Sequence, residues 1–167
     1  SYTPSQIANY VTTLSNRGTV FDLSIMDKIT DEEGKTVKKY KVKEKRQLNY
    51  KDEYWDAVQS GMRGVVTGAG SSVSSVFRGA KYQIAGKTGT AQEDKTRPNH
   101  ALFISYGPYE DPEIAVAAVI PFGYTSSNAA SLAKNIYDYY FANDKEKEKL
   151  EKNNQTATEA ASGVVGD

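Results

Sequence analysis

The segment from Ile84 to Gln92, which reads IAGKTGTAQ, constrains the fold more than any other part of this chain. Its two glycines, Gly86 and Gly89, lack the Cβ atom that would keep a ligand away from the backbone. A peptide can therefore lie against such a strand edge as an added strand. One lysine and two threonines stand among the glycines, and these side chains suit the binding of a carboxylate. The segment predicts an edge strand that walls a binding cleft.

A phosphate-binding loop of the form G-x-x-x-x-G-K-[ST] is the alternative for Gly86-Lys87-Thr88. That loop requires a glycine five positions before Gly86, where this chain has Lys81. It also requires a helix after the lysine, whereas Gly89 follows Thr88 directly. The sequence therefore favours a strand over a nucleotide site.

The context of this segment resembles one protein family. Gly86-Lys87-Thr88-Gly89-Thr90-Ala91 resembles the K-T-G motif of the transpeptidase domain in penicillin-binding proteins. The stretch Ser1–Ala8 is similar to the helix start that follows the S-x-N motif in class B, monofunctional members. Three later stretches resemble the last two strands of that domain: His100–Phe103, Gly107–Tyr109 and Pro112–Val116. The likeness extends over residues 1–141, so the chain is identified as the C-terminal part of such a domain.

The resemblance implies an α+β fold of the β-lactamase/transpeptidase type, in which helices flank an antiparallel sheet. It also implies roles for the motif residues. Lys87 would supply a positive charge beside the nucleophile, and Thr88, Gly89 and Thr90 would bind the substrate, the two hydroxyls holding its terminal carboxylate. The Thr90 amide N–H would form half of the oxyanion hole, so Lys87 and Thr90 are the expected catalytic residues.

The implied reaction is acyl transfer from a D-Ala-D-Ala stem peptide to a serine and then to an amine, which cross-links peptidoglycan. β-Lactam antibiotics would acylate the same serine, and no metal or organic cofactor is needed. The remainder of the domain, N-terminal to Ser1, is the expected partner that brings the nucleophile. The implied location is the extracytoplasmic face of a bacterial cell membrane, with an anchor upstream of the chain. A serine β-lactamase, a β-lactam sensor domain and a non-enzymatic scaffold without the nucleophile are the alternatives.

Two decoy motifs imitate the missing family elements. Ser126-Ser127-Asn128 fits S-x-N and Ser131-Leu132-Ala133-Lys134 fits S-x-x-K, but both follow the K-T-G motif, whereas the family order places them before it. On a helical wheel, Ser131 and Lys134 fall opposite the apolar stripe. A solvated lysine beside a solvated serine has nothing to make it a base. We therefore interpret both motifs as parts of a terminal helix.

Composition limits the function further. The 167 residues, 38% hydrophobic and 25% charged, can bury one modest core. The formal net charge is zero, which gives no reason to expect nucleic acid as a partner. The chain has no cysteine and a single histidine, which excludes disulfides and argues against a zinc site. Because His100 has no acidic residue at ligand spacing, we expect it to begin a strand rather than to bind a metal.

The first half of the chain predicts two helices joined by a hairpin. Thr3 and Gln6 form a capping box, and the apolar face of the helix that follows consists of Ile7, Tyr10, Val11 and Leu14. Phe21, Leu23 and Ile25 alternate as in a strand, residues 31–34 form the turn and residues 36–42 return. We interpret the lysine-rich return arm as a solvated edge rather than a partner site. A second helix over 52–66 has Trp55, Val58, Met62 and Val65 on one side.

The second half predicts a sheet, a helix and a tail. After a flexible surface connection at 68–75, strands at 82–90, 101–106 and 114–120 form an antiparallel meander, the last one buried on both faces. The polar connection 92–99 is expected to be mobile. The terminal helix has an apolar stripe of Ala129, Leu132, Ala133, Ile136 and Tyr140. Residues 142–167 are rich in Lys and Glu and then in small residues, which predicts a disordered polar tail.

Overall fold

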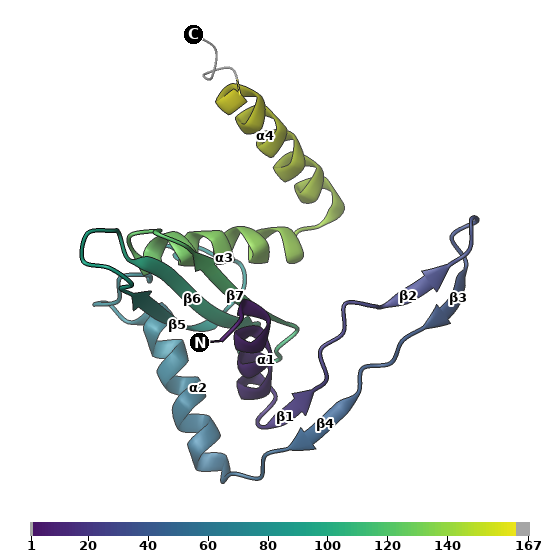
Figure 1. Ribbon diagram of the computed structural model, residues 1–167, viewed down its shortest axis with the longest axis horizontal. Helices are drawn as coiled ribbons and strands as arrows, with labels where there is room; N and C mark the ends of the chain where they lie inside the picture. The colour runs from purple at the N-terminus through teal and green to yellow at the C-terminus, as the bar shows by residue number, and fades with distance from the viewer. Residues whose placement is uncertain (1, 163–167) are drawn as a thin grey trace.

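The computed structural model describes residues 2–162, with side chains described through residue 155. Its helices and strands are α1 (Pro4–Ser15), β1 (Thr19–Phe21), β2 (Lys28–Thr30), β3 (Thr36–Lys39), β4 (Glu44–Gln47), α2 (Asp52–Thr67), β5 (Ala85–Ala91), β6 (His100–Gly107), β7 (Ile114–Ile120), α3 (Ser126–Tyr140) and α4 (Asp144–Ser162). Strands β5, β6 and β7 form an antiparallel sheet in that order, with α1 and α2 on one face and α3 on the other (Figure 1). The α+β fold and the meander are confirmed.

The N-terminal helix α1 begins at the predicted cap. The Thr3 amide N–H donates to Gln6 Oε1 at 2.9 Å, and the Gln6 amide N–H donates to Thr3 Oγ1 at 3.2 Å. Of the predicted apolar face, Val11 and Leu14 are buried, but the Tyr10 side chain is exposed. The sheet therefore covers only half of the apolar stripe of α1.

Residues 19–47 form a long hairpin that projects away from the sheet (Figure 1). Its turn at residues 31–34 is confirmed, because the Gly34 amide N–H donates to the Asp31 carbonyl at 3.1 Å. The predicted continuous strand through Leu23 and Ile25 is wrong, since pairing breaks between β1–β4 and β2–β3 and both side chains are exposed. The base of this arm, β1, packs against α1, but β2 and β3 are exposed throughout, so the apolar alternation beyond β1 gains no burial. The lysine-rich β3 and β4 are fully exposed, which agrees with a solvated edge.

Helix α2 and the connection after it carry side chains into the core. Trp55 and Met62 are buried as predicted, whereas Val58 is exposed. The segment 68–75, predicted as a flexible surface connection, belongs to a run of turns over residues 68–79 that buries Val73 and Phe77. Its small residues allow the tight turns, and the two apolar side chains hold them against the sheet.

The main core lies between the sheet and α3. Alternate residues of β6, Ala101, Phe103 and Ser105, face α3 and are fully buried. Strand β7 was predicted to be buried on both faces, but only Val116 and Ala118, which pair with this same face of β6, are buried. The opposite face of β7 is only partly covered by α1.

Helix α3 packs through small side chains rather than through the predicted stripe. Ala129 and Ala133 are buried as expected, together with Tyr137, whereas Leu132 and Ile136 are exposed. The alanines let the helix approach the sheet closely, and this approach turns the larger aliphatic side chains to solvent.

The predicted disordered tail is wrong over residues 144–162, which form α4; residues 163–167 lie outside the described residues. Asn143 and Glu146 cap this helix reciprocally, and the Glu146 carboxylate accepts from Lys81 Nζ at 2.6 Å. Alternating Lys and Glu side chains add pairs such as Lys152–Glu148 at 2.8 Å, which explains how so polar a segment is helical. Helices within residues 2–162 are all too short or too polar to cross a bilayer.

Candidate functional site

Strand β5 carries the K-T-G segment at one edge of the sheet. It pairs with β6 along its whole length, and its other edge pairs with no strand within residues 2–162. A Cβ atom at Gly86 would lie 2.5 Å from Phe103 Cζ, and one at Gly89 would lie 3.2 Å from Leu102 Cβ. The glycines therefore allow β5 to lie close to β6. Sequence reasoning had assigned them only to ligand approach.

The register of β5 separates the motif residues onto two faces. Lys87 pairs with Ile104, on the face toward α1 and α2, whereas Thr88 and Thr90 pair with Phe103 and Ala101, on the face toward α3. The structure thus does not bring the lysine and the two hydroxyls together on one surface. A ligand can contact the Lys87 ammonium group and the two threonine hydroxyls together only if it lies along the free edge of β5, between the two faces.

Lys87 holds a positive charge that no carboxylate neutralises within the described residues. Its side chain is exposed, and Nζ donates to the Thr88 carbonyl at 2.8 Å. The ion pairs of residues 2–155 do not include Lys87. Because the ammonium group keeps two N–H donors for a ligand, it can hold an anion at the free edge.

An apolar groove borders Lys87 on the same face of the sheet. A cavity of about 510 Å³ is lined by Tyr2, Gln6, Ile7, Tyr10 and Ile104. Ile104 is the cross-strand neighbour of Lys87, so the groove adjoins the lysine. Sequence reasoning missed this groove because it counted Tyr10 as part of a packed helix face. The signal available was that α1 has a wider apolar stripe than one short strand can cover.

The side chains of the two decoy motifs make hydrogen bonds and an ion pair within α3 and the connection before it. Ser131 is exposed and its Oγ donates to the Ser127 carbonyl at 2.9 Å, while Asn128 Nδ2 donates to the Gly123 carbonyl at 2.8 Å. Lys134 is not solvated as predicted: its side chain is partly buried, and Nζ lies 2.5 Å from Asp138 Oδ2. These groups belong to α3, on the sheet face opposite Lys87, so they cannot serve it.

His100 begins β6 as predicted, but the expectation that it lacks an acidic partner is wrong. Its Nε2 lies 3.3 Å from Glu93 Oε2, and its Nδ1 accepts from the Phe122 amide N–H at 3.0 Å. Glu93 comes close because Ala91, two residues before it, pairs with His100 in the β5–β6 ladder. The 92–99 connection was predicted to be mobile, and this contact holds one of its residues, Glu93.

Comparisons with known proteins show the family of the chain. Residues 1–138 match the family described as the penicillin binding protein transpeptidase domain. The chain is 34% identical over 159 residues to the peptidoglycan D,D-transpeptidase MrdA of Haemophilus influenzae, covering 83% of this chain and 23% of the relative. It is 27% identical to penicillin-binding protein 2A of Bacillus subtilis, covering 95% of this chain and 26% of that protein.

A solved structure shares the fold. Penicillin-binding protein 2B of Streptococcus pneumoniae strain R6 superposes with a TM-score of 0.72 at 27% identity, covering 86% of this chain and 26% of that one. The chain therefore spans about a quarter of the length of these relatives.

Proposed function

The chain belongs to the penicillin-binding protein transpeptidase family and matches class B members over part of their length, and we propose that it forms the K-T-G side of a peptidoglycan D,D-transpeptidase site. The protein that contains it would cross-link stem peptides through a serine acyl-enzyme, with D-Ala-D-Ala as donor and β-lactams as inhibitors. The single observation that carries the proposal is Lys87: an uncompensated cation on a free strand edge, beside an uncovered apolar groove.

Each motif residue has a role in this proposal. A donor peptide lies along the free edge of β5, where backbone groups supply binding. Lys87 stabilises the deprotonated nucleophile by its charge, and Thr88 and Thr90 donate hydroxyl hydrogens to the donor carboxylate. Gly89 lets the strand stay close to β6 between them. The Thr90 amide N–H forms half of the oxyanion hole, which stabilises the charge that develops on the carbonyl oxygen.

The nucleophilic serine is proposed to come from a segment of the domain outside this chain. Ser131 cannot reach Lys87, because it lies on α3 behind the sheet. The groove formed by Tyr2, Ile7, Tyr10 and Ile104 lies beside the lysine and is apolar, so it suits a packed helix of that segment. This partner would bring the nucleophile to the lysine, and residues 1–141 would make up this chain's share of the domain. The location proposed for the enzyme is the extracytoplasmic face of the membrane.

Acylation of the full-length protein by a labelled penicillin tests the proposal. A charge-assisted hydrogen bond is worth about 1.5–3 kcal/mol and a neutral one about half as much. Lys87→Ala should therefore lower the second-order acylation rate constant about ten- to a hundredfold, and Thr90→Val should lower it less. Ser131→Ala, the control, should leave it unchanged. Loss of acylation in Ser131→Ala with full acylation in Lys87→Ala would refute the assignment of β5. Rapid release of the acyl group by wild type would indicate a β-lactamase instead.

A further inference from the structure

A cluster around His100 joins two loops that are far apart in the sequence. His100 Nδ1 accepts the Phe122 amide hydrogen, so the ring proton sits on Nε2, which faces the Glu93 carboxylate. Glu93 belongs to the β5–β6 connection, residues 92–99, and Phe122 belongs to the β7–α3 connection, residues 121–125. One imidazole ring therefore contacts both connections, through its two nitrogens.

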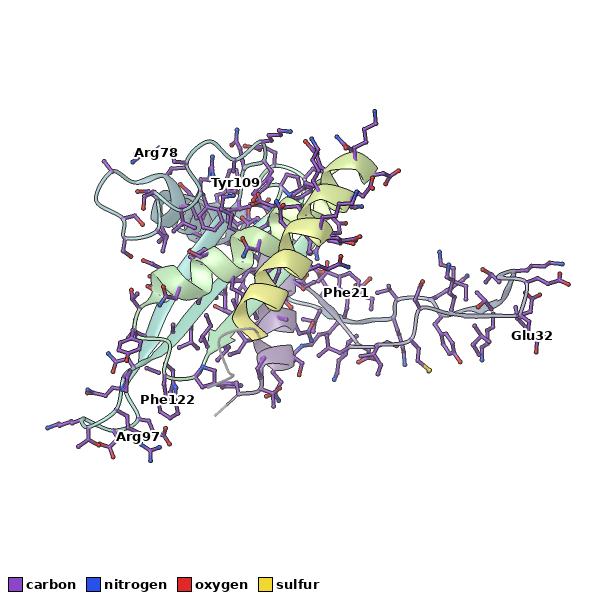
Figure 2. The ribbon with its side chains drawn as sticks, turned by 90° about the horizontal axis from the view of Figure 1, so that it is seen from above. Phe21, Glu32, Arg78, Arg97, Tyr109 and Phe122 are labelled. Carbon is purple, nitrogen blue, oxygen red and sulfur yellow. The ribbon has the colours of Figure 1, made fainter. Side chains whose placement is uncertain are left out.

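Further contacts hold the same two connections together. The Phe122 ring packs on the His100 ring at 4.8 Å between centroids, and the Arg97 guanidinium lies 5.6 Å from the Phe122 ring (Figure 2). The Tyr124 amide N–H donates to the Asn99 carbonyl at 3.0 Å. Phe122 and Tyr124 both have positive φ angles, 54° and 65°, which non-glycine residues rarely adopt. Such a backbone persists only where surrounding contacts determine it. Here the His100 ring holds the Phe122 amide and the Asn99 carbonyl holds the Tyr124 amide, while the Asn128 side chain binds the Gly123 carbonyl between them.

This cluster adjoins the proposed donor site. His100 pairs with Ala91, the residue after Thr90, and its register places it on the same sheet face as Lys87. The threonine hydroxyls are assigned to the donor carboxylate and the groove beside Lys87 to the segment that carries the nucleophile. The rest of a donor that lies along β5 therefore runs toward Gln92 and the two connections. There Tyr124 is 71% exposed and Phe122 is 37% exposed, so aromatic surface is available to it.

We propose that His100 is a positioning residue: it locks the 92–99 and 121–125 connections into one wall, and this wall contacts the part of the acyl donor beyond the reacting carbonyl. The proposal rests on the proposed function, because it assumes that a donor lies along β5. His100 does not touch the reacting atoms. It acts by holding the Phe122 backbone and the Glu93 carboxylate, so its loss should weaken the binding of donors that reach the wall and leave the chemical step unchanged.

The test compares two penicillins on the full-length protein: benzylpenicillin, which carries an acyl side chain, and 6-aminopenicillanic acid, which lacks one. His100→Leu removes both nitrogens, whereas His100→Asn keeps an acceptor at the position of Nδ1. In His100→Leu, the dissociation constant of the non-covalent benzylpenicillin complex should rise about two- to tenfold, as for one lost hydrogen bond. The first-order acylation constant should not change. The values for 6-aminopenicillanic acid should stay within about twofold of wild type, and His100→Asn should restore most of the loss.

Glu93→Gln is the milder variant if His100→Leu does not fold. It keeps the size of the side chain and weakens only the contact to the 92–99 connection, so a smaller shift in the same direction is expected, again confined to benzylpenicillin. Equal weakening of both penicillins, a lower acylation constant, or an Asn variant no better than Leu would each overturn the positioning role. Wild type that neither penicillin acylates would overturn the proposed function, and this inference with it.

Discussion

The two faces of the β5–β6–β7 sheet differ in how completely this chain covers them. On the face toward α3, Ala101 and Phe103 are fully buried and the Phe77 ring stacks on Phe103 at 5.7 Å between centroids. On the face toward α1 and α2, Leu102 and Ile104 are only partly buried, and an apolar groove stays open beside the sheet. The face toward α3, called the closed face below, carries the larger core, whereas the face toward α1 and α2, called the open face, carries a smaller core and Lys87.

Buried hydroxyls show the same difference. On the closed face, the Tyr137 hydroxyl donates to Ser105 Oγ at 2.9 Å. On the open face, the Tyr106 hydroxyl is buried with no hydrogen-bond partner in the described part of the chain, and this burial raises the pKa of Tyr106 to about 12. Buried polar groups in a complete protein core normally have hydrogen-bond partners. The contrast indicates that the side toward α3 is the more completely packed of the two, although Val11, Trp55 and Tyr106 belong to a second core on the side toward α1 and α2.

The largest expected effect concerns the open face. The isolated chain should form no covalent adduct with a labelled penicillin, since the roles proposed for Lys87 and the Thr90 amide N–H are to position an acyl group and neither group would attack it. Intact-mass spectrometry after long incubation measures this directly, with the full-length protein as positive control. A stoichiometric penicilloyl adduct would show that a nucleophile lies within the chain, and Ser131 would then be a candidate.

The next largest effect is a difference in the free energy of unfolding between alanine variants on the two faces. Phe103→Ala empties a fully buried site, so it should lower the free energy of unfolding by about 3–5 kcal/mol. Leu102→Ala, one position away on the partly covered face, should cost about half as much or less, because solvent already reaches the side chain. Urea denaturation of both variants measures the two values. Equal losses would mean that the open face is packed as tightly as the closed one.

The sequence correctly predicted the helices and strands whose local pattern agrees with their packing in the fold. The capping box at Thr3 and Gln6 and the apolar runs of β6 and β7 gave the right elements, although β7 is buried on one face only. The errors share one cause. Val58 and Ile25 would be buried only if another part of the fold packed against them, and the local sequence pattern does not show whether it does. Helix α4 was missed because polar composition was taken as disorder, although its charges are spaced for ion pairs.

The site was predicted in part. Sequence reasoning placed Lys87 on an edge strand, which the structure confirms, but it could not assign faces because that requires the register against β6. It also missed the link between His100 and Glu93. That contact follows from the β5–β6 register, in which Ala91 pairs with His100, and the sequence pattern did not fix that register.

A smaller effect tests the buried hydroxyls. Tyr137→Phe removes the donor to Ser105 and leaves a buried hydroxyl without its partner, so it should lower stability by about 1–2 kcal/mol. Tyr106→Phe is the matched change on the open face, where the hydroxyl has no partner to lose within the described residues, and it should be neutral or slightly stabilising. Thermal and urea unfolding of both variants check the difference. A comparable loss in Tyr106→Phe would show that its hydroxyl is satisfied after all.

The smallest effect concerns α4, which lies beyond α3 and contributes to neither sheet face. Its contacts with the rest of the chain, such as Lys81–Glu146 and the Tyr139 hydroxyl to Glu151, are exposed, so deleting residues 143–167 should change the melting temperature by less than about 2 °C. The difference in far-UV circular dichroism between the full and truncated chains then reports the helix itself.

This helix should also respond to acid. The hydrogen bond from Lys81 and the bond from the Asn143 backbone lower the pKa of Glu146 below its ordinary value, so the folded helix favours the charged carboxylate. A lowered pKa means that the stabilisation is present at neutral pH and is lost as the pH falls through that lowered value. The dichroism difference should therefore shrink below about pH 4. Glu146→Gln should remove part of this pH dependence, because it keeps a capping acceptor without the titrating charge. A dichroism difference that is the same at pH 7 and pH 3 would show that the Lys81–Glu146 pair does not hold α4.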